Sequence, residues 1–139
     1  ARRTFPWGEE APRCDGVVFG RWDGLACALA GRGAEAVGRA SQDRTPEGVR
    51  DLGGNVAEWV TDAFVARHPV CGDVCRDPQN APGTEPLGAA QRVVRGGFWN
   101  EWAGSTRAAG RSRLRRDEYR ANVGFRCVIP RAPSSDGGA

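Results

Sequence analysis

Short apolar stretches alternate with polar, glycine-rich and proline-rich segments along the whole chain of 139 residues. Four stretches are rich in valine or aromatic residues and have the length of β-strands, namely residues 16–19, 56–61, 92–94 and 124–129. Twenty glycines and nine prolines divide the rest into loops. The pattern predicts a loop-rich α+β fold with little regular secondary structure.

The α component of this prediction is a helical stretch over residues 105–116, although its arginine spacing leaves no clean apolar face. The chain shows no internal repeat and no linker, and its length suits one domain with one core. We therefore expect one domain over residues 1–131, followed by a flexible tail of small residues over 132–139. A membrane span is not expected, since no apolar run approaches the necessary length of about 20 residues.

Charge is unevenly distributed along the sequence. Residues 92–131 hold ten arginines against three acidic residues, whereas residues 1–91 hold ten arginines against thirteen acidic residues. An anionic partner could bind the C-terminal part, but we favour arginines that pair with acids of the first part. Nucleic acid is not an expected partner, because no RNA-binding or helix-turn-helix signature accompanies the charge. Arginine without any lysine, in a chain rich in alanine and glycine, suggests a GC-rich bacterial genome.

Five cysteines are many for a cytosolic chain of this size. The simplest pairing joins Cys14 to Cys27 and Cys71 to Cys75, which leaves Cys127 over. Disulfides imply an oxidising compartment, so we expect a periplasmic or extracellular location. Zinc is the alternative ligand of four thiolates, but the spacings are not the paired C-x₂-C units of zinc sites.

Several motifs occur in a fixed order. They are Phe5-Pro6-Trp7-Gly8, Gly54-Asn55-Val56-Ala57-Glu58-Trp59, Arg95-Gly96-Gly97 and Gly124-Phe125-Arg126-Cys127. In this order and spacing the chain resembles the C-terminal portion of the formylglycine-generating (sulfatase-modifying factor) family. The resemblance implies that family's variant of the C-type-lectin fold, and an upstream half of the same domain as a partner.

The loop over residues 51–58 is the first candidate site. Its carboxylates and backbone carbonyls are hard oxygen ligands, which suit calcium. The resemblance implies a calcium ion bound by the side chains of Asp51 and Glu58 and the carbonyls of Gly54 and Val56. The alternative is that Glu58 pairs with a buried arginine while Asp51 caps a turn. We favour calcium, because a loop-rich fold needs such a staple.

The second candidate site follows the Gly-Gly motif. Formylglycine-generating enzymes carry two cysteines there, five residues apart, whose thiolates bind copper(I). These positions fall at Glu101 and about Thr106, and no cysteine lies between Cys75 and Cys127. Copper and catalysis are therefore not expected. The prediction is a non-catalytic, calcium-stabilised ligand-binding or scaffold domain; the alternative is a formylglycine-generating oxidase or related oxidoreductase completed by the upstream half.

A set of aromatic and cationic residues forms the candidate ligand-binding surface: Trp102, Arg107, Arg111, Arg113 and Tyr119. These residue types are frequent binding hot spots. The variable proteins of diversity-generating retroelements, which use the same fold, bind ligands with the matching segment. A protein, peptide or glycan is the expected partner. Arginines held in salt bridges, with no binding role, are an equally open interpretation, and we expect Trp99 in the core.

Overall fold

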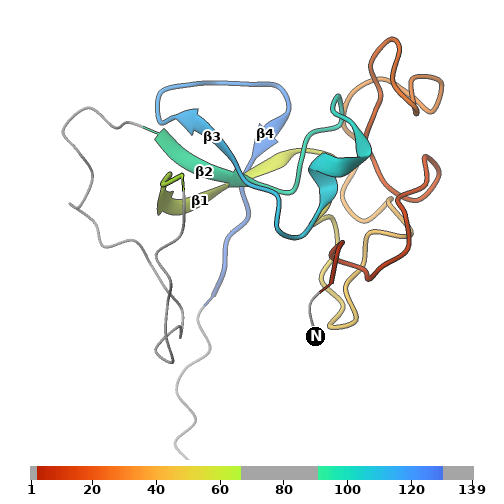
Figure 1. Cartoon of the computed structure of the whole chain (residues 1–139), viewed down its shortest axis with the longest axis horizontal. Helices are drawn as coiled ribbons and strands as arrows, with labels where there is room; N and C mark the ends of the chain where they lie inside the picture. The colour runs from red at the N-terminus through yellow and green to blue at the C-terminus, as the bar shows by residue number, and fades with distance from the viewer. Residues whose placement is uncertain (1–2, 67–90, 130–139) are drawn as a thin grey trace, which may run out of the picture.

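A computed structural model describes residues 3–66 and 91–129 of the chain. Four strands and one short 3-10 helix make up its regular structure: β1 (Ala57–Ala63), β2 (Gln91–Arg95), the 3-10 helix η1 (Ala103–Thr106), β3 (Ser112–Arg115) and β4 (Val123–Gly124). The described part contains no α-helix, and most of it is loop, as Figure 1 shows. The predicted loop-rich character is confirmed.

The four strands form one sheet in the order β3-β2-β1-β4. Neighbouring strands are antiparallel except for β1 and β4, which are parallel. Glu58 of β1 lies opposite Arg95 of β2, and the register between these strands shifts between Trp59 and Ala63. The segment before β1 folds as irregular loops beside one end of the sheet, next to η1 (Figure 1). Backbone hydrogen bonds join the two parts, because Gly20 donates to the carbonyl of Glu101 and Arg21 to that of Trp99.

Two of the four predicted strands are confirmed, since β1 and β2 cover residues 56–61 and 92–94 almost completely. The prediction of a strand over residues 16–19 is wrong. The backbone turns there, because Gly16 and Val17 both donate to the carbonyl of Arg13. The apolar run of Val17, Val18 and Phe19 marks burial, not strand pairing, as each is at most 3% exposed.

Two other sequence predictions also fail. Only the first residue of the predicted strand 124–129 is in β4, and the exposed fractions of Phe125, Val128 and Ile129 are 75%, 81% and 91%. The predicted helix over 105–116 is replaced by the end of η1 and by β3. In β3 only Leu114 is buried, and pairing with β2 satisfies the backbone, so tertiary contact overrides a weak helical pattern.

The described residues contain two small apolar clusters. One unites the sheet through Ala57, Val94, Phe98 and Leu114. The other lies in the N-terminal loops around Val17, Phe19 and Cys27, and Trp7, Cys14 and Ala103 pack against it. The second cluster therefore attaches the N-terminal loops to η1.

The disulfide between Cys14 and Cys27 is present, with the two Cα atoms 5.3 Å apart, which confirms that pairing. The predicted partners Cys71 and Cys75 lie outside the described residues, as does the tail over 132–139. Cys127 is exposed and is not in a disulfide with a described cysteine. Within residues 3–66 and 91–129 no helix is long and apolar enough to cross a membrane.

Candidate functional site: the acidic loop and the adjoining cavities

The acidic loop over residues 51–58 owes its shape to residues that tolerate a positive φ. Asp51, Gly54 and Asn55 have φ values of 56°, 101° and 61°. Gly54 is buried, and a Cβ atom there would lie 2.5 Å from the carbonyl oxygen of Val18. The buried Asn55 holds the loop in place, because its side chain accepts from the backbone N–H of Glu35 and donates to the carbonyl of the same residue. Glycine and asparagine are the residues suited to such a conformation.

Glu58 forms an ion pair with an arginine of the Gly-Phe-Arg motif. The Nε and Nη2 atoms of Arg126 donate to the two carboxylate oxygens of Glu58 at 2.6 and 2.5 Å. The same guanidinium donates to the carbonyl oxygens of Arg50 and Asp51 at 3.0 and 2.7 Å. The bond to Glu58 is the largest cause of a raised pKa of Arg126, and the negative charges of Glu58, Asp51 and Asp43 add to the rise. Arg126 thus places a positive charge inside the acidic loop.

Asp51 caps a neighbouring turn, with its Oδ2 atom accepting from the backbone N–H of Gly38 at 2.6 Å. The two predicted carbonyl ligands lie nearby in sequence: Gly54 donates its N–H to Gly96, and Val56 directly precedes β1. The donor chemistry of this loop suits calcium. In the observed arrangement, however, both oxygens of Glu58 are bonded to Arg126, so an ion would need Arg126 to leave. Among residues 3–66 and 91–129, neither this loop nor any other region brings together three acidic, histidine or cysteine side chains that could hold a metal.

Asp43 is a member of this site that the sequence did not reveal. Its side chain is buried, with the residue 1% exposed, and its Oδ2 atom accepts from the N–H of Gly53 at 2.8 Å. The Oδ1 atom is buried without a hydrogen-bond partner among the described residues. Burial raises the pKa of Asp43 to about 6, and the nearby charge of Asp51 adds to the rise. No periodicity or motif distinguishes Asp43 from the other acids of the first part.

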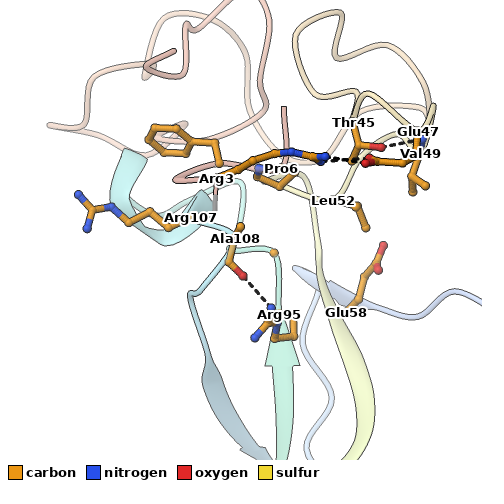
Figure 2. Close-up of a pocket in the computed structure, with 12 residues that line it drawn as sticks. Arg3, Pro6, Thr45, Glu47, Val49, Leu52, Glu58, Arg95, Arg107 and Ala108 are labelled. Atoms are coloured by element: carbon orange, nitrogen blue, oxygen red, sulfur yellow. Dashed lines mark hydrogen bonds and ion pairs between the residues drawn. The ribbon is translucent and has the colours of Figure 1, made fainter. Parts of the chain in front are cut away.

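A cavity of about 580 Å³ adjoins the acidic loop and is shown in Figure 2. Apolar side chains line much of it, and Arg3 and Glu47 form an ion pair across its edge at 2.5 Å. Arg95 lies at the end of β2 and donates to the carbonyl of Ala108 at 2.7 Å (Figure 2). A cavity of this volume with apolar walls and a few charged groups is typical of small-ligand sites.

The predicted ligand-binding surface is distributed over several places in the structure. Arg107 lines the cavity of Figure 2, but its guanidinium points away from Arg95. The guanidinium groups of Arg111 and Arg113 lie 5.2 and 5.0 Å from the ring centre of Phe64. Trp102 and Tyr119 are 67% and 96% exposed.

Trp102 and Tyr119 belong to different hollows of the surface. Trp102 lines a cavity together with Arg111, whereas Tyr119 lines a shallow one together with Trp59. Trp99 is half-buried, and its ring centre lies 6.2 Å from that of Trp22. Arg111 therefore shares one cavity with Trp102 and another with Arg113, whereas the predicted set as a whole does not form one surface.

The two positions implied for catalytic cysteines lie beside η1. Glu101 is half-buried, and burial raises the pKa of its carboxyl group. Thr106 is completely buried, with its hydroxyl donating to the carbonyl of Ala103 at 2.8 Å. A buried hydroxyl bonded to the backbone and a carboxylate are not soft ligands of the kind that select copper(I).

The fold and these sites together describe a loop-rich domain with a small curled sheet, an ion-paired acidic loop and a cleft beside it. A family profile described as "Sulfatase-modifying factor enzyme 1-like domain" matches residues 1–131. The chain therefore belongs to this family. It is also 28% identical over 141 aligned residues to the formylglycine-generating enzyme of Mus musculus, an alignment that covers 96% of this chain. The chain spans 36% of the length of that relative.

Proposed function

We propose that this chain is a non-catalytic ligand-binding or scaffold domain of its family, with the family's C-type-lectin-like fold. The main support for this proposal comes from the residues beside η1. Glu101 and the buried Thr106 occupy the positions implied for the two copper-binding cysteines. Without thiolates at these positions, copper(I) loses the ligands that it prefers. The cavity of Figure 2 supports the ligand-binding role, since its volume of about 580 Å³ suits part of a peptide or a glycan.

The alternative function is an oxidase that converts a cysteine of a sulfatase to formylglycine and is completed by further chain upstream. The 28% identity to the Mus musculus formylglycine-generating enzyme favours this alternative. The two proposals differ in their dependence on thiolates. A periplasmic or extracellular location belongs to both of them, supported by the disulfide between Cys14 and Cys27.

An activity assay separates the two proposals. The protein is incubated with copper(I), oxygen and a cysteine-containing sulfatase peptide, and the peptide is analysed by mass spectrometry. We expect no conversion of the thiol to an aldehyde, while the Mus musculus enzyme serves as the positive control. Aldehyde formed at a rate above that of copper alone would overturn the non-catalytic proposal.

We also propose that calcium binds the acidic loop by displacing Arg126 from Glu58. The ion-pair geometry supports this competition, because both carboxylate oxygens of Glu58 are bonded to Arg126. Calorimetric titration with calcium should show tighter binding to Arg126→Gln than to the unmodified protein, and none to Glu58→Gln. Absence of calcium binding to both the unmodified protein and Arg126→Gln would refute this part.

A further inference from the structure

A second cavity, of about 280 Å³, shares Arg95 and Gly96 with the cleft of Figure 2. Most of the rest of its lining comes from the segment between β2 and β3, including Glu101, Trp102 and Arg111, and Ala57 of β1 completes it. Trp102 is fixed against η1, since a Cβ atom on Gly104 would lie 1.9 Å from its ring. The cavity is therefore formed mainly by the segment from β2 to β3, closed by the first residue of β1.

Arg111, which lines this cavity and a neighbouring one that Phe64 also lines, carries an unused hydrogen-bond donor. Its Nη2 atom is buried and has no partner among the described residues. The guanidinium is held over the ring of Phe64 at 5.2 Å, and Arg113 lies over the same ring at 5.0 Å. A buried donor without an acceptor destabilises the structure, and it does so more strongly when it is charged. This destabilisation would be removed by an acceptor that enters the cavity.

Among the described residues, the lining of this cavity contains two arginines, Arg95 and Arg111, and a single acidic residue. Partial burial lowers the pKa of Arg95, and the positive charge of Arg111 lowers it further. Arg95 uses one nitrogen to bond the carbonyl of Ala108, although part of its side chain is exposed. Glu101 is the acid in the lining, and it forms no ion pair with either arginine in the described part of the chain. Burial raises the pKa of Glu101, which disfavours its negative charge.

We propose that this cavity binds an oxyanion, the carboxylate or sulfate group of a larger ligand, between Arg95 and Arg111. Guanidinium groups bind such oxyanions with parallel, charge-assisted hydrogen bonds. A volume of about 280 Å³ suits a charged group and its nearest atoms, and the shared wall at Arg95 leads to the larger cleft for the rest. This inference deepens the proposed ligand-binding function and rests on it.

Titration with sodium sulfate and with sodium acetate, at constant ionic strength maintained with sodium chloride, tests the proposal. Tryptophan fluorescence is the readout, because Trp102 lines the cavity, and Trp102→Phe identifies its share of the signal. We expect saturable binding of at least one anion. The stronger of the two identifies whether the ligand group is a sulfate or a carboxylate.

Matched variants show whether the cavity is responsible. Arg111→Gln should weaken binding at least about tenfold, the loss expected for a charge-assisted hydrogen bond. Arg116→Gln removes the same charge from an exposed residue outside both cavities and should leave binding unchanged. Arg111→Lys, which retains the charge without the planar fork, should bind more weakly than the unmodified protein. If Arg111→Gln does not fold, Arg111→Lys and Arg95→Gln decide the question.

Absence of saturable binding, or equal losses in Arg111→Gln and Arg116→Gln, would overturn the oxyanion site and indicate general charge attraction only. Failure of the oxyanion site can be distinguished from failure of the proposed non-catalytic function. A protein that produces aldehyde in the copper assay and still binds the anion refutes the non-catalytic role alone. A protein that does neither refutes the oxyanion site alone.

Discussion

The ion pair between Arg126 and Glu58 provides the sharpest test of the structure. Arg126 joins the C-terminal motif to the acidic loop through Glu58, Arg50 and Asp51, which precede it by about 70 residues. Removing Arg126 therefore breaks a long-range link and leaves the carboxylate of Glu58 without its partner. We expect Arg126→Gln to destabilise the fold far more than loss of a surface charge does.

The size of this effect follows from the exposure of the pair. Loss of one partner from a fully buried pair costs about 3–5 kcal/mol, and an exposed pair contributes about 0–1 kcal/mol. The side chains of Arg126 and Glu58 are 35% and 20% exposed, so screening by solvent reduces the effect. We expect a loss of about 2 kcal/mol, which for a chain of this length lowers the melting temperature by about 8 °C.

Urea unfolding of the unmodified protein, both single variants and the double variant Arg126→Gln with Glu58→Gln measures the coupling energy. We expect at least about 1 kcal/mol of coupling, with unchanged m-values. Arg115→Gln is the matched control, because its pair with Asp117 is 64% and 68% exposed and should contribute little. Equal effects of Arg126→Gln and Arg115→Gln, or coupling near zero, would refute the reasoning.

Three further predictions concern the same loops. Because burial raises the pKa of Asp43 to about 6, the folded state binds this proton more tightly than the unfolded state does. The free energy of unfolding should therefore rise by about 2 kcal/mol as the pH falls from about 7 to about 4.5. Urea unfolding at several pH values should show a smaller rise for Asp43→Asn. A pH profile that Asp43→Asn leaves unchanged would exclude Asp43 as its source. Gly54→Ala should lower the free energy of unfolding by at least about 3 kcal/mol, because strain at φ 101° adds to a clash with Val18. The control Gly24→Ala, at φ 84° with open space around it, should lower it by about 1 kcal/mol in the same urea unfolding measurement. Equal losses in the two variants would contradict the clash. Replacing Cys14 and Cys27 by alanine should lower stability by about 3 kcal/mol through loss of the 13-residue cross-link, and an unchanged melting temperature would disprove this contribution.

The acidic loop shows how a single motif can hold two interpretations. Its glycines, asparagine and carboxylates are readable from the sequence, and they suit a calcium ion. The same carboxylate can also be neutralised by an arginine from a distant motif. The structure has Arg126 bonded to both oxygens of Glu58, so a calcium ion has to compete with this guanidinium for the carboxylate.

Much of the architecture was readable from local pattern. Valine-rich and aromatic runs predicted the strands β1 and β2, and the glycine and proline content predicted the dominance of loops. Spacing predicted the disulfide between Cys14 and Cys27, because a disulfide requires only two cysteines that a turn can bring together. The ordered series of motifs identified the family, and the absent cysteines between Cys75 and Cys127 defined the question of its activity.

Local pattern could not separate burial from strand pairing. Val17, Val18 and Phe19 are apolar because they fill the cluster around Cys27, while their backbone turns. Only long-range contact assigned Leu114 to a strand, brought Arg126 to Glu58 and placed Asp43 in a buried position. Strand pairing, ion pairing and burial of these residues depend on contacts between segments that are distant in the sequence. A short sequence window contains no information about those contacts. The chain alone therefore determined its family and its inventory of chemical groups, whereas the tertiary structure decided which charges are paired and which face a cavity.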